Sequence, residues 1–381
     1  MASQNEELED RPPLTLDEVA QLPPVAPTED APPEVAQGLA RRRLRVSGVP
    51  GGPAQLDADI RSRGEEDPVV EMVLPEQAQI GEPGRTGDLL SRSDYDLPAQ
   101  STTEPMRPAW APQSAQPHQA SQRTVQGRLR RLDGTSLEPH YGIYGPDDRA
   151  VYYPGSYPWH SVGRIFTWTN WTGGSGGWSW WGSGVLVGPR HVLTAGHVCP
   201  WGAASWAMKF VPGYWNGAPA SGAGAESFIS DYRGWNTNNT VAAHDMAVLR
   251  LFEPVGSWLG WMGTKTYSSS WEDLPVWTLA GYPGAVAAGE RPSYQTSIPV
   301  LDDDSDGSAT EIEHHGDASG GVSGGPFFGW WDEKPYAIGA HSGGQATTGT
   351  PFGLGDEDNN VEAGGQAMVD LVLWAHQNWP A

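Results

Sequence analysis

The stretch Gly320-Gly321-Val322-Ser323-Gly324-Gly325-Pro326 decides how the rest of this 381-residue chain is interpreted. A serine flanked by glycines lies on a backbone that no Cβ crowds, so neighbouring N–H groups can converge on one point. Convergent N–H donors are what an oxyanion hole requires. A glycine-rich loop can equally be a flexible turn, and the heptapeptide alone does not separate these two interpretations.

Two motifs upstream favour the first interpretation. In Leu193-Thr194-Ala195-Gly196-His197-Val198-Cys199 a histidine follows two short apolar runs that read as strands. In His244-Asp245-Met246-Ala247-Val248-Leu249-Arg250-Leu251 an aspartate opens an alternating strand. A lone histidine or aspartate at a strand end is usually structural. The order His197, Asp245, Ser323, however, is one of the known orders of the acyl-transfer triad, so these are the candidate catalytic residues.

These residues resemble the chymotrypsin-like (trypsin-like) serine proteases, which carry T-A-x-H, D-h-A-h-h-x-h and G-x-S-G-G/S-P in this order. Further motifs are similar to those of the bacterial glutamyl endopeptidases, the group that includes staphylococcal V8 protease: Gly145-Pro146-Asp147-Asp148-Arg149, Ala280-Gly281-Tyr282-Pro283-Gly284 and Ala337-Ile338-Gly339-Ala340-His341-Ser342-Gly343-Gly344. The resemblance covers residues 141–381. It implies an all-β fold of two antiparallel six-stranded β-barrels followed by a C-terminal helix.

The composition divides the chain near residue 140. Residues 1–140 carry 23 acidic residues and 14 arginines without a lysine, and one of the 19 tryptophans. Such a proline-rich stretch buries too little apolar surface to fold, so we expect a long disordered pro-segment or tail, with short helices near 14–22 and 34–45. Residues 141–381 are expected to form the protease domain, with the first barrel at 141–265 and the second barrel and helix at 266–381.

Short apolar runs bounded by Gly, Pro and Asn predict the strands of both barrels. Those of the first barrel are 162–168, 182–187, 192–194, 206–211, 226–231 and 246–251. Those of the second are 275–280, 297–301, 310–315 and 337–344. Residues 364–379 predict an amphipathic C-terminal helix.

The resemblance also implies a mechanism. Ser323 attacks a peptide carbonyl, His197 takes its proton and later passes it to the leaving amine, and Asp245 holds the imidazole. The backbone N–H groups of Gly321 and Ser323 form the oxyanion hole. Val322 stands where trypsin-type enzymes have an aspartate that pairs with a liberated N-terminal amine, so activation must differ here.

Five residues are expected to contact the substrate. His341 can donate a hydrogen bond to a substrate carboxylate, although a histidine packed in the barrel wall is the alternative. Ser319 supplies a hydroxyl next to the position where the glutamyl endopeptidases often have a threonine. Ser342, Gly343 and Gly344 are expected to accept the substrate as an added strand. The expected cleavage is after Glu, and less readily after Asp.

Two other functions stay open. One is an endopeptidase of the same fold that prefers small or apolar residues. The other is a protease-like binding module without catalysis, against which an intact triad argues. Labelling of Ser323 by a fluorophosphonate would separate enzyme from module, because it requires a working His-Ser pair.

An acidic stretch fits the spacing of a calcium loop. Asp302-Asp303-Asp304-Ser305-Asp306-Gly307, with Glu313 in the twelfth position, matches D-x-D-x-D-G-x5-E, which makes Asp302, Asp304, Asp306 and Glu313 candidate ligands. The flanks are strand-like rather than helical, so an acidic hairpin with an Asp-Gly turn is the favoured interpretation. We expect no cofactor.

Charge and composition limit the partners. The net charge of −23 argues against nucleic acid, and no run of 18 apolar residues could span a membrane. We expect a protein or peptide substrate and a monomer. The resemblance implies a secreted protein that is processed shortly before Asp147, and Arg128-Leu129-Arg130-Arg131 is a stretch that a processing protease could cut. Met1 to Asp10 shows no signal peptide.

Overall fold

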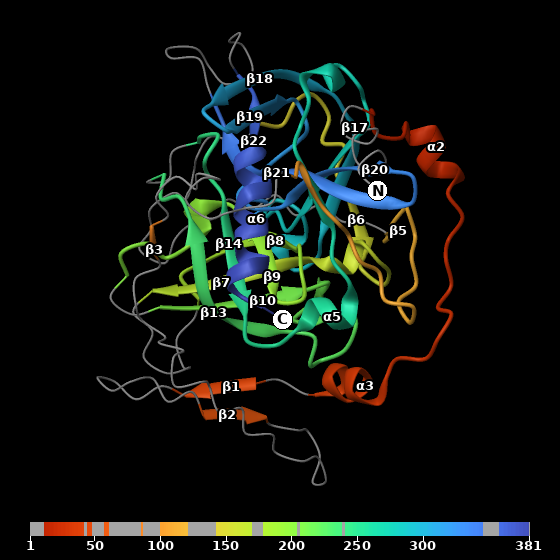
Figure 1. The fold of residues 1–381 in the computed structure, drawn as a ribbon, viewed down its shortest axis with the longest axis vertical. Coiled ribbons are helices and arrows are strands. Elements are labelled where there is room, and N and C mark those ends of the chain that lie inside the picture. The colour runs from red at the N-terminus through yellow and green to blue at the C-terminus, as the bar shows by residue number, and fades with distance from the viewer. Residues whose placement is uncertain are drawn as a thin grey trace.

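The computed structural model describes residues 11–41, 44–47, 57–60, 85–86, 100–120, 142–169, 178–203, 206–237, 241–345 and 358–380. In this part of the chain most of the regular structure is β-strand, arranged as two barrels with the C-terminal helix α6 lying across both (Figure 1). The basic stretch Arg128–Arg131, considered above as a processing site, lies outside the described residues.

Six antiparallel strands close the first barrel. The pairing runs β10–β7–β8–β9–β14–β13, and β13 returns to pair with β10. The strands are β7 (Val162–Thr169), β8 (Trp180–Leu186), β9 (His191–Thr194), β10 (Trp206–Pro212), β13 (Ser227–Gly234) and β14 (Ala247–Leu251). These six strands confirm the sequence prediction, with bounds close to those expected.

Alternating apolar side chains of these strands fill the first barrel. Ile165, Val192, Met208, Phe210 and Leu249 have no solvent-exposed surface and belong to one core cluster. Each buried side chain of this size stabilises the fold by about 1.5–3 kcal/mol. The period-2 pattern that revealed the strands is therefore the pattern that builds the core.

The second barrel follows the order β18–β19–β22–β21–β20–β16–β17, and it closes because β17 continues into β18 across Pro299. Its strands are β16 (Trp277–Gly281), β17 (Ser293–Ile298), β18 (Val300–Asp306), β19 (Ala309–His314), β20 (Pro326–Trp331), β21 (Lys334–Gly344) and β22 (Asn360–Gly365). The sequence predicts all of these except β20 and β22. The C-terminal helix α6 spans Gln366–Asn378 and contacts strands of both barrels.

Shorter elements complete the described structure. They are α5 (Val255–Leu259), the 3-10 turns η1 (Trp159–Ser161), η2 (Gly196–Val198), η3 (Ser269–Trp271) and η4 (Ala287–Gly289), and the strands β1 (Leu44–Ser47), β2 (Asp57–Ile60), β3 (Arg85–Thr86), β4 (Thr102–Thr103), β5 (His118–Gln119), β6 (Ala150–Tyr153), β11 (Tyr214–Trp215), β12 (Ala218–Pro219) and β15 (Gly263–Lys265). None of the helices described here is long and apolar enough to cross a membrane.

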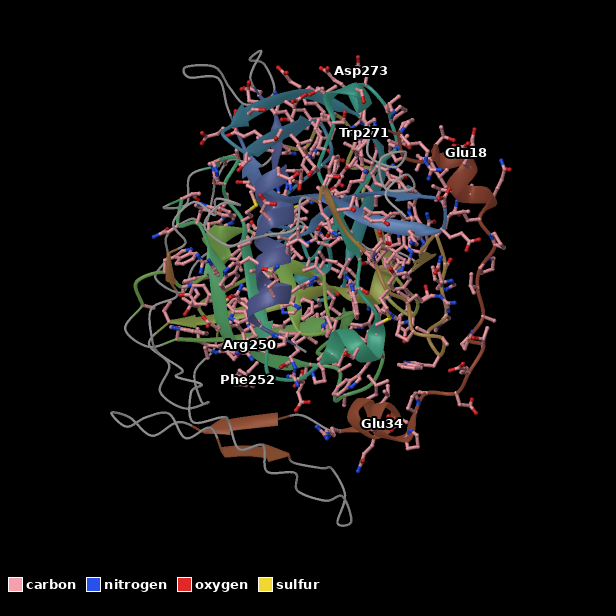
Figure 2. The ribbon with its side chains drawn as sticks, viewed as in Figure 1. Glu18, Glu34, Arg250, Phe252, Trp271 and Asp273 are labelled. Atoms are coloured by element: carbon pink, nitrogen blue, oxygen red, sulfur yellow. The ribbon has the colours of Figure 1, made fainter. Side chains whose placement is uncertain are left out.

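Part of the region expected to be disordered lies against the barrels. Residues 11–41, called here the N-terminal strap, contain α2 (Leu16–Gln21) and α3 (Pro33–Ala40), which match the two short helices that the sequence suggests. Figure 2 labels Glu18 on α2 and Glu34 on α3, at the outer side of the molecule. Composition indicated disorder because it does not reveal where single apolar residues dock.

The N-terminal strap runs from one barrel to the other. The N–H of Leu14 donates to the carbonyl of Trp330, at the end of β20, and the N–H of Gly224 donates to the carbonyl of Leu39. Val19 packs with the core of the second barrel and Val35 with that of the first, and both are less than one-tenth exposed. These contacts involve neither His197, Asp245 nor Ser323.

Candidate active site

A buried carboxylate at the start of β14 holds the candidate catalytic histidine. His197 lies in η2, directly after β9, and its Nδ1 is 2.6 Å from Oδ2 of Asp245. Its backbone N–H donates to Oδ1 of the same carboxylate at 2.9 Å. The Asp245 side chain is fully buried, whereas that of His197 is 12% exposed. The aspartate therefore orients the imidazole with Nδ1–H donated and Nε2 as the basic nitrogen.

Two hydroxyl groups complete the hydrogen bonds to Asp245. Thr237 donates to Oδ1 at 3.2 Å, and Ser342, from β21 of the second barrel, donates to Oδ2 at 2.7 Å. Such donors offset the cost of burying the charged carboxylate. The sequence places Ser342 in the substrate groove, but its side chain is fully buried and directed at Asp245. Thr237 follows no motif and is missed by the sequence analysis.

The candidate nucleophile Ser323 reaches this pair from the second barrel. Its carbonyl accepts a hydrogen bond from the N–H of Ser183 in β8 at 2.7 Å. The next residue, Gly324, has φ +79°, and a Cβ on it would lie 2.1 Å from Oγ1 of Thr194. Only glycine fits there. This close contact brings Ser323 against the strand that ends just before His197.

The two predicted oxyanion-hole donors lie on peptides whose carbonyl groups are held. The carbonyl of Gly320 accepts from the N–H of Gly284 at 2.7 Å. The carbonyl of Val322 accepts from the N–H three residues later, also at 2.7 Å. Because the N–H of a trans peptide points opposite to its carbonyl, the N–H groups of Gly321 and Ser323 are directed away from these partners. The geometry suits a pair of donors to one oxyanion.

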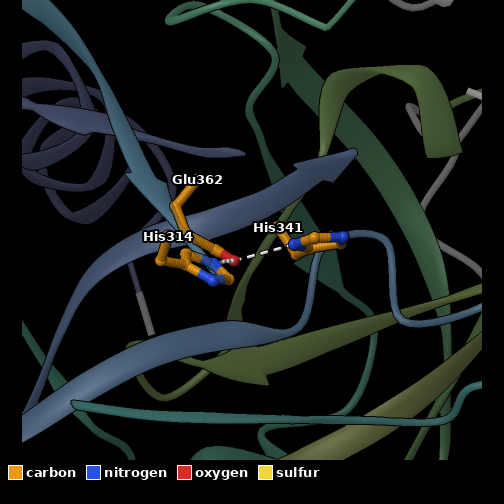
Figure 3. A group of neighbouring side chains, drawn as sticks. All are labelled: His314, His341 and Glu362. Atoms are coloured by element: carbon orange, nitrogen blue, oxygen red, sulfur yellow. Dashed lines mark hydrogen bonds and ion pairs between the residues drawn. The ribbon is translucent and has the colours of Figure 1, made fainter. Parts of the chain in front are cut away.

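His341, the residue expected to contact the substrate side chain, is fully buried in β21. Figure 3 shows its imidazole beside Glu362 and His314. Nδ1 of His341 and Nε2 of His314 lie 2.7 and 2.9 Å from the same oxygen, Oε1 of Glu362. In the register of β21 and β22, His341 and Glu362 are direct partners. The sequence analysis missed Glu362 and His314 because their meeting depends on this register.

The hydrogen bonds around His314 assign the protons of this cluster. The N–H of Gly316 donates to Nδ1 of His314 at 2.9 Å, so the proton of His314 is on Nε2 and is donated to Glu362. His341 likewise donates from Nδ1, which leaves its Nε2 a lone pair when the ring is neutral. Burial lowers the pKa of His341 to about 3 and raises the pKa of Glu362 to about 7. The cluster therefore disfavours an isolated positive charge on His341.

The same cluster could in principle hold a metal ion. Among the described residues, His314, His341 and Glu362 are the only group of at least three His, Cys, Asp or Glu whose ligand atoms lie within 4.8 Å of one another. Two imidazoles and a carboxylate are suitable zinc ligands. Here each imidazole already donates a proton to the carboxylate, and all three side chains are enclosed. The arrangement is that of a hydrogen-bonded network.

The four calcium candidates lie on a β-hairpin. Asp302, Asp304 and Asp306 follow one another along β18, and Glu313 on β19 is the cross-strand partner of Asp302. Alternate residues of a strand are about 6.6 Å apart, so three carboxylates in this pattern do not close around one ion as a loop would arrange them. This is the acidic hairpin that the sequence favours. Oδ2 of Asp306 lies 3.2 Å from Nδ1 of His244, next to Asp245.

The remaining substrate candidates lie beside the nucleophile. The Oγ of Ser319 accepts a hydrogen bond from Nη1 of Arg149 at 2.8 Å. Gly343 and Gly344 lie where β21 extends beyond β20, since the pairing of those strands ends at Ala340 whereas β22 pairs on to Gly344. Beyond Ala340, one edge of β21 is therefore not covered by β20. An added substrate strand requires such an edge.

Three solved structures have a similar fold. They are a Glu endopeptidase in complex with MPD (17% identity, TM-score 0.47), the protease Anisep from Arthrobacter nicotinovorans (20%, 0.42) and the thermostable serine protease AL20 from an extremophilic microorganism (19%, 0.41). The matches cover 62%, 59% and 57% of this chain and 100%, 99% and 98% of those chains, respectively. A search of curated proteins finds no sequence match.

One family model matches the chain, and its description is Trypsin. The match spans residues 152–354, more than half of the 381 residues, and includes His197, Asp245 and Ser323. The matched region contains all six strands of the first barrel and the second barrel as far as β21. The chain therefore belongs to the trypsin family and is a chymotrypsin-like serine protease.

Proposed function

We propose that this serine protease is an endopeptidase that cleaves peptide bonds after Glu, and less readily after Asp, through Ser323, His197 and Asp245. The observation that carries the proposal is the fully buried carboxylate of Asp245, bonded to both the backbone N–H and the Nδ1 of His197. An imidazole held in this way presents Nε2 as a general base.

Each residue has one task in the reaction. His197 takes the proton of the Ser323 hydroxyl as that oxygen attacks the substrate carbonyl, because an alcohol is a weak nucleophile at neutral pH. The N–H groups of Gly321 and Ser323 stabilise the oxyanion, an effect worth about 3–4 kcal/mol per donor. His197 then protonates the leaving amine, and water hydrolyses the acyl-enzyme by the same route. Asp245 stabilises the imidazolium in both steps.

The substrate backbone lies along residues 342–344 as an added strand, since β20 does not cover this edge of β21. The specificity for Glu is assigned to His341. When neutral, its Nε2 carries a lone pair and cannot donate to a carboxylate, so binding a glutamate requires one additional proton on the imidazole or on the substrate. Glu362 supplies the counter-charge to a protonated His341.

One observation favours a second candidate function. His341 is fully buried, so a substrate side chain reaches it only by displacing a neighbouring group. A pocket that keeps this imidazole covered and neutral would suit small or apolar side chains. The second candidate is therefore an endopeptidase of the same fold with that preference.

Domain roles follow from the same proposal. Residues 141–381 would be the protease domain, and the residues before them the pro-segment of a secreted, monomeric zymogen. The N-terminal strap contacts both barrels away from the triad, so any inhibition by this part of the chain would not be a direct block of Ser323.

A digest of an unstructured protein, with cut sites identified by mass spectrometry, tests the proposal. We expect cuts after Glu from the wild-type chain and none from Ser323→Ala. His341→Ala should lose the Glu preference while general activity persists. An unchanged preference would remove His341 from the pocket, and cuts after small or apolar residues would support the second candidate. No cuts, together with no fluorophosphonate labelling of Ser323, would indicate a binding module.

A further inference from the structure

The loop that carries Ser323 has no ionic anchor of the usual kind. Val322 is apolar, 3% exposed and packed in the core of the second barrel. Yet the turn before it is constrained, because the N–H of Val322 donates to the carbonyl of Ser319 at 3.2 Å. Whatever fixes Ser319 therefore fixes the start of the turn that carries the oxyanion-hole donors. We call residues 319–323 the nucleophile loop.

A buried arginine holds Ser319. Arg149 donates from Nη1 to Oγ of Ser319 at 2.8 Å, and its side chain is only 4% exposed. Its Nε and Nη2 donate to the two carboxylate oxygens of Asp147 at 2.9 and 2.8 Å. The bond to Arg149 lowers the pKa of Asp147. The bidentate pair fixes the plane of the guanidinium, so the third nitrogen is aimed at Ser319.

A buried aspartate fastens the same segment two residues before Ser319. Asp317 is 1% exposed, and its two carboxylate oxygens accept from the N–H groups of Tyr144 and Asp148 at 2.9 and 2.8 Å. The N–H of Ala318 donates to the carbonyl of Gly142 at 2.9 Å. Thus three successive residues, 317–319, each bind residues 142–149, called here the docked segment.

The docked segment is itself anchored to the second barrel. The side chain of Asn360 accepts from the N–H of Gly142 at 3.1 Å and donates to its carbonyl at 3.0 Å. The Tyr144 ring stacks on His315 with 4.1 Å between centroids, and its hydroxyl donates to the carbonyl of Asp358 at 2.8 Å. A segment fixed at so many points can hold the nucleophile loop in one geometry.

We propose that Arg149 and Asp317 are positioning residues for catalysis, which fasten the docked segment to the nucleophile loop and so set the oxyanion hole that Val322 cannot anchor by charge. The inference rests on the proposed catalytic role of Ser323. Arg149 acts on the reaction only through Ser319, and Asp317 acts through the backbone of residues 144–148. Displacement of an oxyanion donor by a fraction of an ångström mainly slows the chemical step.

Steady-state kinetics of full-length variants on a peptide substrate test the inference. We expect Arg149→Ala to lower kcat by about tenfold or more with KM changed by less than about twofold. Arg149→Lys should recover part of kcat, because an ammonium can still donate to Ser319. Ser319→Ala should lower kcat in the same direction while the pair of Arg149 and Asp147 persists. The double variant of Arg149→Ala and Ser319→Ala should be no slower than the worse single variant.

Arg41→Ala is the matched control. Arg41 also pairs with a carboxylate, that of Glu253 at 3.4 Å, but it lies on the N-terminal strap. We expect its kcat to equal that of the wild type. If Arg149→Ala does not fold, Ser319→Ala alone decides, and a wild-type kcat for that variant overturns the inference. Equal kcat losses in Arg41→Ala and Arg149→Ala would also overturn it.

Hydrogen exchange separates this inference from the proposed function. If the wild-type chain hydrolyses nothing, the catalytic assignment fails, but the positioning can still be measured. Amide protection of residues 318–323 should fall in Arg149→Ala and Ser319→Ala, and should be unchanged in Arg41→Ala. Unchanged protection in Ser319→Ala would show that the docked segment does not order the nucleophile loop.

Discussion

At the scale of single residues, one carboxylate oxygen serves two histidines. Oε1 of Glu362 accepts from His314 and from His341 within a fully enclosed cluster. Burial opposes a positive charge on His341 and a negative charge on Glu362 alike, which lowers the pKa of the first and raises that of the second. A substrate carboxylate would enter this balance as a third acidic group.

Replacing Glu362 by Gln should therefore weaken discrimination between substrates. Without the counter-charge, a protonated His341 costs more, so we expect the ratio of kcat/KM for cleavage after Glu to that after Gln to fall by about tenfold. The uncharged Gln substrate should be nearly unaffected. Glu226→Gln removes a carboxylate that is 5% exposed in the first barrel and serves as the control. An unchanged ratio in Glu362→Gln would contradict the role given to His341.

Motifs reveal some site residues and geometry alone reveals others. His197, Asp245 and Ser323 were recognised because each lies in a local pattern whose backbone requirement is readable, such as the glycine at 324 that a Cβ would drive into Thr194. Glu362 stands in the run Asn360-Val361-Glu362-Ala363-Gly364-Gly365, which has no chemical signature. Its role appears only when the register of β21 and β22 pairs it with His341.

At the scale of elements, the hairpin of β18 and β19 concentrates like charges. Asp302 faces Glu313 and Asp304 faces Glu311 across the strands. Burial raises the pKa of Glu313 to about 7, the side-chain bond from Asn359 lowers it, and the charges of Asp302, Glu311 and Asp304 raise it further. Cross-strand pairs of this kind destabilise a sheet when both members are ionised.

Glu313 should make the stability depend on pH. Because its pKa is raised from 4.5 to about 7 in the folded chain, its contribution is fully present below pH 4.5 and is lost as the pH rises through about 7. We expect Glu313→Gln to raise the urea midpoint relative to wild type more at pH about 8 than at pH about 5. Glu333→Gln, at an exposed position between β20 and β21, is the control. A parallel shift at both pH values would contradict the assignment.

Two strands and one boundary escaped the sequence analysis for a common reason. β20 begins at Pro326, inside the catalytic motif, and β22 ends in Gly364 and Gly365, so glycine and proline hid their extended backbone. The helix predicted from residue 364 begins instead at Gln366. Both strands are stabilised by pairing with β21 on either side rather than by local preference.

At the scale of the whole molecule, the N-terminal strap joins the barrels from outside. Val19 docks on the second barrel and Val35 on the first, each nearly buried. The composition of the first 140 residues gave no sign of this, because a strap needs only a few apolar contacts on a surface that already exists. Its contribution is then to stability rather than to the chemistry of Ser323.

Shortening these contacts should lower stability and leave the site intact. We expect Val19→Ala and Val35→Ala each to cost about 1–2 kcal/mol in unfolding free energy, with kcat unchanged. Thermal unfolding followed by circular dichroism, beside an activity assay, measures both quantities. Gln21→Ala, at an exposed position in α2, controls for substitution within the strap. A rise in kcat without loss of stability would instead mark the strap as inhibitory.

The bonds to Asp245 have a consequence for how this molecule loses function. Its carboxylate is held by His197 from one barrel and by Ser342 from the other, so it acts as a stitch across their seam. Neither half of the chain can assemble the stitch alone. Hydrolysis thus reports the alignment of two otherwise self-contained bodies, and a slight slippage between them would silence the enzyme while each body remains folded.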